Sequence, residues 1–318
     1  MSDIPVSYSV ANTNALLSSV IPQFTIEKPL CCEFWCQGIN DTYKVKTASK
    51  TFILRLYRHN WRTKDEICFE IDALLHLHKK GVNVAYPITT TQGDYIVEVS
   101  LPEGLRYAIL TSFIGGKELD LSTQQDTVLY AQHVAQLHLN SKGFTTDHPR
   151  FQLDVKHLLT EPLKRIKPFL KNDDWIFIKA YSQALSKKLQ HAFSESKDLI
   201  LCHGDLHGGN THNDSSALGS FDFDCCAMGL RSYDLAVFKW SLAVNKKDEN
   251  IWQQFLESYQ QQILLSPDEL TLIDSLVSIR HIWLMGLHID IAVAKGWLNG
   301  RYFDQKISFL RKQYSLGY

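Results

Sequence analysis

The spacing of hydrophobic residues changes once along this chain, near residue 122, and this change limits the folds that it can adopt. Residues 32–57 contain three alternating segments, EFWCQG, DTYKVKT and TFILRLY, separated by the turn-prone sequences GIND and TASK. Alternation of this kind is typical of strands, so we expect a three-stranded antiparallel meander. Two further strands are expected around YPITTTQ and DYIVEV, followed by the strand-like segment RYAILTSF.

An amphipathic helix is expected after the meander. Residues 63–80 place Ile67, Ile71, Leu74, Leu75 and Leu77 on one stripe, and Gly81 follows where such a helix would end. Five or so strands and this helix make a small N-terminal unit.

Beyond residue 122 the hydrophobic spacing becomes helical. The segments TQQDTVLYAQHVAQLHLN, DVKHLLTEPLKRIKPFL and DDWIFIKAYSQALSKKLQHAF carry apolar residues at helical intervals. Strand-like DLILC and ALGSFDFD follow, and from SYDLAVFKWSLAV onward the chain is almost entirely helical, with a capping box at residues 266–269. We therefore predict an α+β protein with two lobes. Residues 1–112 form a five-stranded antiparallel sheet with one helix, and residues 113–318 form a larger, mostly helical lobe.

The composition of the chain disfavours some classes of binding partner. The chain has 318 residues and a formal net charge of -1, so it lacks the basic field that binding to nucleic acid or an anionic membrane requires. The N-terminus has no charged leader or apolar core of a signal peptide, and Arg280, His281, His288 and Asp290 interrupt the most apolar late segment. We expect a cytoplasmic protein that acts on a small molecule or a specific protein, with a buried helix around residues 275–297.

Residues 201–214, LCHGDLHGGNTHND, gather imidazoles, carboxylates and amides between two predicted strands. Asp205 and Asn210 have the spacing of a kinase catalytic loop, in which the aspartate accepts or orients the hydroxyl proton and the asparagine binds metal. Asp222 in SFDFD follows after a short strand connection and can supply a second metal-binding carboxylate. Phosphoryl transfer to an alcohol is one chemistry that these three residues can perform.

Two other interpretations of this stretch stay open from the residues alone. His203, Asp205 and His207, with Cys202 as a fourth candidate, are donors that suit zinc in a metal-dependent hydrolase, although three nearby glycines favour a tight loop. The stretch can also be a polar turn whose side chains bond local backbone. Under the kinase hypothesis, His203 braces the loop, and His207 faces the acceptor or solvent.

The paired motifs HGDLHGGN and FDFDCCAMGLRSYDLA resemble the aminoglycoside phosphotransferase and choline kinase superfamily, which has a protein-kinase-like fold. The segment TFILRLYRHNWRTKDEICFEIDAL is similar to the branch that contains the type II homoserine kinases and stress response kinase A. The resemblance runs from about residue 35 to residue 240. It implies a kinase that uses ATP and Mg²⁺.

The resemblance also implies roles for individual residues. Asp205 corresponds to the catalytic base, and Asn210 and Asp222 correspond to the Mg²⁺ ligands. Arg55 lies where this fold keeps a basic side chain for the α and β phosphates, and Glu70 would orient it.

The nucleotide-binding positions follow in the same way. Gly38, Asn40 and Tyr43 match the phosphate-loop pattern, and the backbone of Ser112 and Ile114 corresponds to the hinge that receives adenine.

Three features depart from the protein-kinase pattern. The phosphate loop has one glycine rather than three, and Arg55 replaces the usual lysine. Asp224 stands where protein kinases have glycine, in a position from which it can contact metal or substrate. Asp234 in SYDLA corresponds to a family position that supports the catalytic loop.

The sequence leaves the phosphate acceptor open. A small amino alcohol such as homoserine and a protein serine or threonine are both candidates, and a small acceptor predicts a closed acidic pocket. A hypothesis of another class is a catalytically silent nucleotide-binding module, although such proteins usually lose the base or a metal ligand. The oligomeric state is not predicted.

Overall fold

The computed structural model describes residues 4–196, 199–214 and 217–317, which form two compact units. Unit 1 contains the residues up to Lys117 together with Thr145–Arg150 and His212–Asp224. Unit 2 contains Glu118–Phe144, Phe151–Thr211 and the chain from Cys225 onward. Two short segments that are distant in sequence thus return to unit 1. The division of functional lobes after residue 112 stays a prediction.

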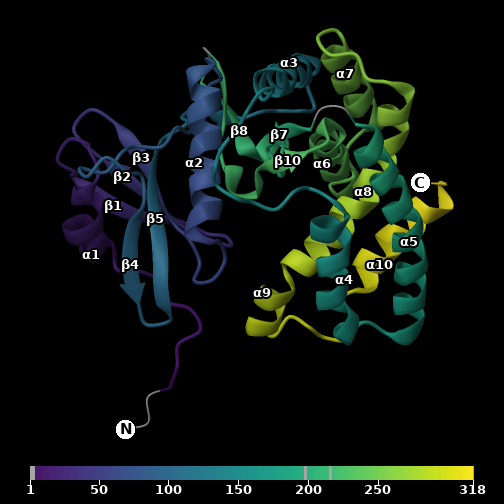
Figure 1. Cartoon of the computed structure of the whole chain (residues 1–318), viewed down its shortest axis with the longest axis horizontal. Helices are drawn as coiled ribbons and strands as arrows, with labels where there is room; N and C mark the ends of the chain where they lie inside the picture. Colours follow the sequence, from purple (N-terminus) through teal and green to yellow (C-terminus); the bar gives the residue numbers. More distant parts are fainter. Residues whose placement is uncertain (1–3, 197–198, 215–216, 318) are drawn as a thin grey trace. The chain divides into compact units, whose positions relative to one another are not determined.

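A five-stranded antiparallel sheet forms the centre of unit 1 (Figure 1). Its strands lie in the order β1-β2-β3-β5-β4, and the predicted meander of the first three is confirmed. The strands are β1 (Cys31–Gln37), β2 (Asp41–Lys46), β3 (Thr51–Leu56), β4 (Val97–Leu101) and β5 (Gly104–Ser112).

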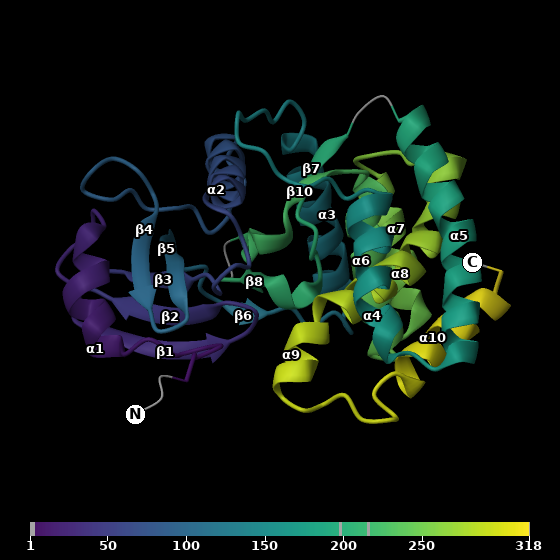
Figure 2. The ribbon, with the colours of Figure 1, turned by 60° about the horizontal axis from the view of Figure 1, so that its bottom comes forward.

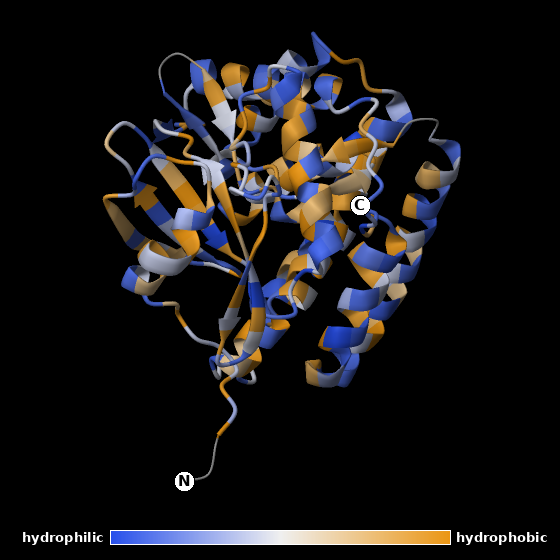
Figure 3. Ribbon diagram, turned by 60° about the vertical axis from the view of Figure 1, so that its left-hand side comes forward, coloured by the Kyte–Doolittle hydropathy of each residue, from blue (hydrophilic) through white to orange (hydrophobic). Residues whose placement is uncertain are grey.

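The alternation of side chains decides what covers each face of this sheet, and Figure 3 shows hydrophobic and hydrophilic residues alternating along its strands. One face buries Val45, Leu54 and Leu110 beneath the N-terminal segment, which contains α1 (Thr13–Ala15) and helical turns up to Gln23. Helix α2 (Lys64–Lys79) packs on the opposite face, where Ile109 joins a second buried cluster.

Helix α2 begins and ends at the residues that its sequence predicts. Thr63 caps the first turn and forms a reciprocal capping box with Glu66. Gly81 follows the helix with a φ of 82°, a conformation that costs glycine little because it has no Cβ. The predicted helix at residues 63–80 is therefore confirmed.

Residues 86–92 do not form the predicted strand, because their backbone is divided between two partners. The Ile88 N–H donates to the Leu110 carbonyl at 2.8 Å, whereas the Thr89 carbonyl accepts from the Thr25 N–H, also at 2.8 Å. Pro87 has no N–H to donate to a ladder. This segment makes only isolated bridges, and β4 begins at Val97.

Unit 2 is mostly helical, as predicted (Figure 2). Its helices are α3 (Gln124–Asn140), α4 (Glu161–Ile166), α5 (Asn172–Glu195), α6 (Arg231–Val244), α7 (Glu249–Gln260), α8 (Pro267–Leu287), α9 (Ile289–Ala294) and α10 (Asp304–Ser315). Helix α8, which starts with the predicted capping box, packs against α4, α5, α6 and α10.

Short strands precede and follow the motif-bearing loop. The predicted strand DLILC is present as β7 (Ile200–Cys202), which pairs with β10 (Ala227–Gly229), while residue 198 lies outside the described residues. A three-stranded sheet contains β6 (Lys117–Glu118), β8 (Thr211–Asn213) and β9 (Leu218–Ser220).

Among the described residues, α8 is the one helix whose length and composition would allow it to cross a membrane. Its most apolar stretch is 72% buried within the fold, which is the pattern of a core helix. The predicted buried helix is therefore confirmed up to Leu287. Beyond it the short helix α9 follows, and Val293 and Trp297 are exposed, so the prediction was wrong for the last part of residues 275–297.

Arg106 of β5 ties the N-terminal segment to the sheet. Its side chain is fully buried, and its guanidinium donates to Asp41 at 2.8 Å and to the carbonyls of Leu56 at 2.9 Å and Ser9 at 3.0 Å. Because a buried charge is tolerated only with partners, these contacts fix the backbone at Ser9.

Replacing Arg106 with methionine should lower the free energy of unfolding by about 3–5 kcal/mol, because Asp41 would remain buried without its partner. Lys46→Met is the control, since it removes an exposed pair with Glu33 whose loss should leave stability nearly unchanged. Urea denaturation measures both values, and similar small losses would contradict this role for Arg106.

Candidate active site

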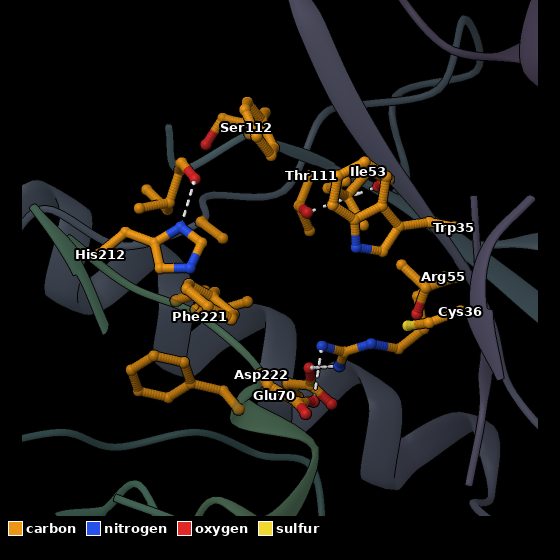
Figure 4. A pocket seen from close by; sticks show the side chains of 16 residues that line it. Trp35, Cys36, Ile53, Arg55, Glu70, Thr111, Ser112, His212, Phe221 and Asp222 are labelled. Atoms are coloured by element: carbon orange, nitrogen blue, oxygen red, sulfur yellow. Dashed lines mark hydrogen bonds and ion pairs between the residues drawn. The ribbon is translucent and has the colours of Figure 1, made fainter. Parts of the chain in front are cut away.

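Unit 1 contains a pocket on the sheet face that α2 covers (Figure 4). Ile53, Leu74 and Phe221 give it apolar walls, while Arg55 and Asp222 place opposite charges at one end. Figure 4 shows Trp35 and His212 on opposite sides of this pocket. An apolar cavity with a few charged groups is the usual form of a small-molecule site.

Arg55 joins two carboxylates at the charged end of the pocket. It lies 2.6 Å from Glu70 on α2 and 2.9 Å from Asp222, and the exposed fractions of the three side chains are 15%, 1% and 50%. Tyr57 donates to the second Glu70 oxygen at 2.8 Å. Burial alone would lower the pKa of Arg55, but Glu70 and Asp222 raise it well above its ordinary value. The guanidinium is therefore a permanent cation in the pocket.

Asp222 is held in an unusual backbone conformation. Its φ of 65° lies in the left-handed region, which non-glycine residues seldom adopt. This conformation costs about 1–2 kcal/mol and is found mainly where the surrounding structure or function requires it. The carboxylate of Asp222 is half exposed and lines the pocket next to Arg55.

Asp224 is engaged by donors from distant parts of unit 1. It is 5% exposed, and its carboxylate accepts from Asn40 at 3.0 Å, Trp61 at 2.7 Å and Arg62 at 3.0 Å. Arg150 donates to its backbone carbonyl. Burial favours the neutral acid, but Arg62, Arg55 and Arg150 hold the pKa of Asp224 below its ordinary value. The carboxylate therefore serves as an anchor within the fold.

The predicted phosphate-loop residues lie in different surroundings. Gly38 is exposed, and its N–H donates to the carbonyl of Asn40 at 3.0 Å. The Asn40 side chain is occupied by Asp224 and by the N–H of Arg58, so it shapes the loop from within. Tyr43 points away from the pocket into the core on the opposite face of the sheet.

The predicted hinge residues line the pocket. The Ser112 N–H donates to the Tyr86 carbonyl at 2.9 Å, and its hydroxyl accepts from the Tyr86 N–H at 3.1 Å. The carbonyl of Ile114 accepts from Nδ1 of His212 at 3.3 Å, as the dashed line in Figure 4 shows. His212 is a pocket residue that the sequence analysis did not single out.

In unit 2, the predicted catalytic loop runs from β7 to the 3₁₀ turn Gly208–Asn210. Asp234 of α6 accepts from the backbone N–H groups of His203 at 2.7 Å and Gly204 at 2.8 Å. The Asn210 side-chain NH₂ donates to the Asp205 carbonyl at 3.0 Å, which leaves its amide oxygen as the atom able to bind a cation. The loop thus joins Asp205 and Asn210 directly.

The histidines of this loop brace its backbone. Nδ1 of His203 accepts from the Asp205 N–H at 3.2 Å, and Nδ1 of His207 accepts from the Gly209 N–H at 3.1 Å. Among the described residues, no group of three histidine, cysteine or acidic side chains is arranged to hold a metal ion. These contacts favour a bracing role over the zinc interpretation.

Asp205 has a partner that the sequence analysis did not assign to the site. Arg280 of α8 forms an ion pair with one Asp205 carboxylate oxygen. Burial would raise the pKa of Asp205, but Arg280, His207 and His203 lower it below its ordinary value. The signal in the sequence was an arginine within the apolar part of α8, because such a charge requires a buried partner.

The donors predicted for Mg²⁺ have suitable chemistry, since Mg²⁺ prefers oxygen ligands and often binds only one or two protein groups. The Asn210 amide oxygen and the half-exposed Asp222 carboxylate meet this requirement. Asn210 belongs to unit 2 and Asp222 belongs to unit 1.

Comparison with known sequences gives a consistent set of relatives. Residues 35–270 match the profile described as the phosphotransferase enzyme family. The uncharacterized protein sll1119 of Synechocystis is 32% identical over 97% of this chain and 87% of its own length. Amicoumacin kinase of Bacillus subtilis is 24% identical over 80% and 78%, and homoserine kinase of Neisseria meningitidis is 28% identical over 73% and 74%. Stress response kinase A of Escherichia coli is 24% identical over 83% and 80%.

Solved structures show the same fold. A microcompartment-associated aminopropanol kinase matches with a TM-score of 0.75 and 21% identity over 94% of this chain and 93% of its own. Amicoumacin kinase hAmiN, in complex with AMP-PNP, Ca²⁺ and Ami, matches with a TM-score of 0.72 and 20% identity over 87% and 88%. The predicted α+β, protein-kinase-like two-lobe fold is therefore confirmed.

Two neighbouring aspartates allow a matched test of the anchor. Asp224→Asn should lower the free energy of unfolding by about 3–5 kcal/mol, because it removes the carboxylate charge that pairs with buried Arg62. Asp222→Asn should change it by about 1 kcal/mol or less, because this side chain is half exposed and Arg55 retains Glu70. Urea denaturation of both variants provides the measurement. Equal effects would show that Asp224 is not the anchor.

Proposed function

Because the chain belongs to the phosphotransferase enzyme family, we propose that it transfers the γ-phosphate of Mg-bound ATP to a hydroxyl group of a small molecule. Membership of the family confirms the resemblance seen in the motifs and the prediction that the chain is a kinase. The observation that supports the finer proposal most strongly is Arg55, a permanent cation fixed by Glu70 at the charged end of an apolar pocket.

The pocket of unit 1 suits a nucleotide. Ile53 and Phe221 offer apolar surface to a purine ring, and Arg55 can grip phosphate oxygens with its planar fork. We expect adenine to use the Ser112 carbonyl and the Ile114 N–H, because the other polar backbone atom of each residue is already bonded.

Asn210 and Asp222 would hold Mg²⁺, which neutralises charge on the phosphate oxygens when it is bound. This role requires the catalytic loop of unit 2 and Asp222 of unit 1 to converge around the triphosphate. The strained backbone at Asp222 supports a functional role, since the fold keeps its half-exposed carboxylate at the pocket.

Asp205 would orient the acceptor hydroxyl and accept its proton. Its lowered pKa makes this carboxylate a weak base, so it is ionised at neutral pH but takes the proton only late in the reaction. Phosphoryl transfer passes through a loose transition state, in which alignment of the hydroxyl matters more than early proton removal.

A small-molecule acceptor is favoured because relatives include kinases named for amicoumacin and homoserine, and a neighbouring structure is an aminopropanol kinase. The alternative of a protein serine or threonine draws support from stress response kinase A, which is 24% identical. A panel of hydroxyl compounds and peptides, assayed for Mg-ATP-dependent phosphate transfer, decides between them. A silent module would transfer phosphate to none of them.

We expect Asp205→Asn to lower turnover by at least about 10²-fold, because the amide cannot accept the hydroxyl proton. Binding of Mg-ATP, measured by calorimetry, should change little. Asp248→Asn is a control at an exposed helix cap in the same unit. Turnover at the wild-type level in Asp205→Asn would remove this residue from the mechanism.

Asp222→Ala should weaken binding of ATP in the presence of Mg²⁺ much more than in its absence, because the substitution removes a proposed metal ligand. Calorimetric titration with ATP, with Mg²⁺ and with EDTA, measures the two affinities. An equal loss under both conditions would assign Asp222 to the fold or to Arg55 instead of the metal.

A further inference from the structure

Arg280 lies at the centre of a buried cluster in unit 2. It belongs to α8 and is 2% exposed, so its charge requires partners within the fold. Its Nη2 pairs with Oδ1 of Asp205, and its Nη1 donates to the carbonyl of Gly204 at 3.2 Å. One guanidinium therefore holds two successive residues of the catalytic loop.

Two tryptophan rings lie next to this guanidinium. Its central carbon lies 4.6 Å from the centre of the Trp283 ring and 5.5 Å from that of Trp240. A cation over an aromatic face is stabilised by about 0.5–2 kcal/mol, more when it is removed from water. The rings therefore favour the charged side chain at this buried position.

Each tryptophan is itself fixed by a histidine. The Trp240 N–H donates to Nδ1 of His281 at 3.1 Å, and the Trp283 N–H donates to Nε2 of His157 at 3.2 Å. Burial lowers the pKa of His281 to about 4, so its ring is neutral near pH 7 and can accept this bond. Its Nε2 lies 3.1 Å from the carbonyl of Lys306, to which it donates. The aromatic walls around Arg280 are therefore set before any ligand binds.

The contacts of Asp205 show which of its two carboxylate oxygens Arg280 occupies. Arg280 occupies one carboxylate oxygen, and the Asp205 side chain is 25% exposed. Charge-assisted bonds from a guanidinium restrict the orientation of a carboxylate. The second oxygen is therefore presented in a fixed direction.

We propose that Arg280 is a positioning residue that fixes Asp205, so that one carboxylate oxygen stays available to the acceptor hydroxyl. This inference rests on the proposed function, in which Asp205 orients that hydroxyl. The cluster of Arg280, Trp240 and Trp283 is a fixed support that acts through Asp205 and does not itself touch the reacting atoms.

The test compares three variants of the full-length protein. Arg280→Met removes the charge and keeps an unbranched, apolar side chain, while Arg280→Lys keeps the charge but loses the fork. Arg231→Met is the control, because it breaks an ion pair with Glu269 in the same unit and has no contact with Asp205. Circular dichroism and Mg-ATP binding establish that each variant is folded.

The first readout needs no ligand. A crystal structure of each variant shows the direction of the Asp205 carboxylate. This direction should be unchanged in Arg231→Met and should differ in Arg280→Met, because Arg280 then no longer holds Oδ1 of Asp205. An unchanged Asp205 carboxylate in Arg280→Met would overturn the proposal.

The second readout is turnover with whichever acceptor the wild-type protein phosphorylates. Arg280→Met should lower kcat by about 10²-fold, because a shift of about 1 Å in a catalytic group has an effect of this size. KM for Mg-ATP should change little. A loss confined to KM would overturn the proposal.

Arg280→Lys keeps the test decisive if Arg280→Met does not fold. The lysine keeps a positive charge beside Asp205, yet kcat should stay below the wild-type value because one ammonium cannot reproduce the two bonds of the fork. Full wild-type kcat in Arg280→Lys would overturn the positioning role. Failure of the proposed function is recognised separately, since Asp205→Asn would then turn over like the wild type.

Discussion

The candidate active site depends on carboxylates that are paired with arginines inside the fold. Burial raises the pKa of Glu70 above its ordinary value, and Arg55 opposes this rise. A buried charge is stable only when a partner of opposite charge and further hydrogen bonds replace the water it loses. This protein meets the requirement with arginines. Arg55 joins Glu70 to Asp222, Arg62 holds Asp224, and Arg280 holds Asp205.

In unit 1 these pairs also organise the pocket. The Asp224 carboxylate accepts a hydrogen bond from Asn40, which fixes the loop that follows β1. It also accepts hydrogen bonds from Trp61 and Arg62, which lie in the connection before α2. Asp222, two residues earlier, is thereby left half exposed beside Arg55. Two aspartates that are nearly adjacent in sequence thus have different tasks, because one is surrounded by donors and the other faces the pocket.

Local patterns in the sequence predicted much of the fold. Alternation predicted the meander, the apolar stripe that ends before Gly81 predicted α2, and the capping box at residues 266–269 marked the start of α8. The segment at residues 86–92 was mispredicted because its pairing depends on residues near 25 and 110, which are distant in sequence. Propensity alone contains no information about such partners.

In the candidate active site, too, the sequence predicted the residues that are close together in the chain but not their distant partners. The spacing of Asp205 and Asn210 and the SFDFD segment are local signals, and the family match supports the interpretation drawn from them. Arg280 has no such spacing, because it reaches Asp205 from a helix 75 residues away in sequence. The anchoring of Asp224 by Asn40 and Arg62 was likewise invisible, since it depends on how β2, α2 and the returning segment pack within unit 1.

A crystal structure of the chain with AMP-PNP and Mg²⁺ would show whether Asn210 and Asp222 bind one metal ion. We expect the triphosphate against Arg55, with one Mg²⁺ bound by both the Asn210 amide oxygen and the Asp222 carboxylate at about 2.0–2.1 Å. Asp205 should lie beside the γ-phosphate, where an acceptor hydroxyl can enter. A nucleotide bound in another place, or a metal ion bound by neither Asn210 nor Asp222, would contradict this expectation.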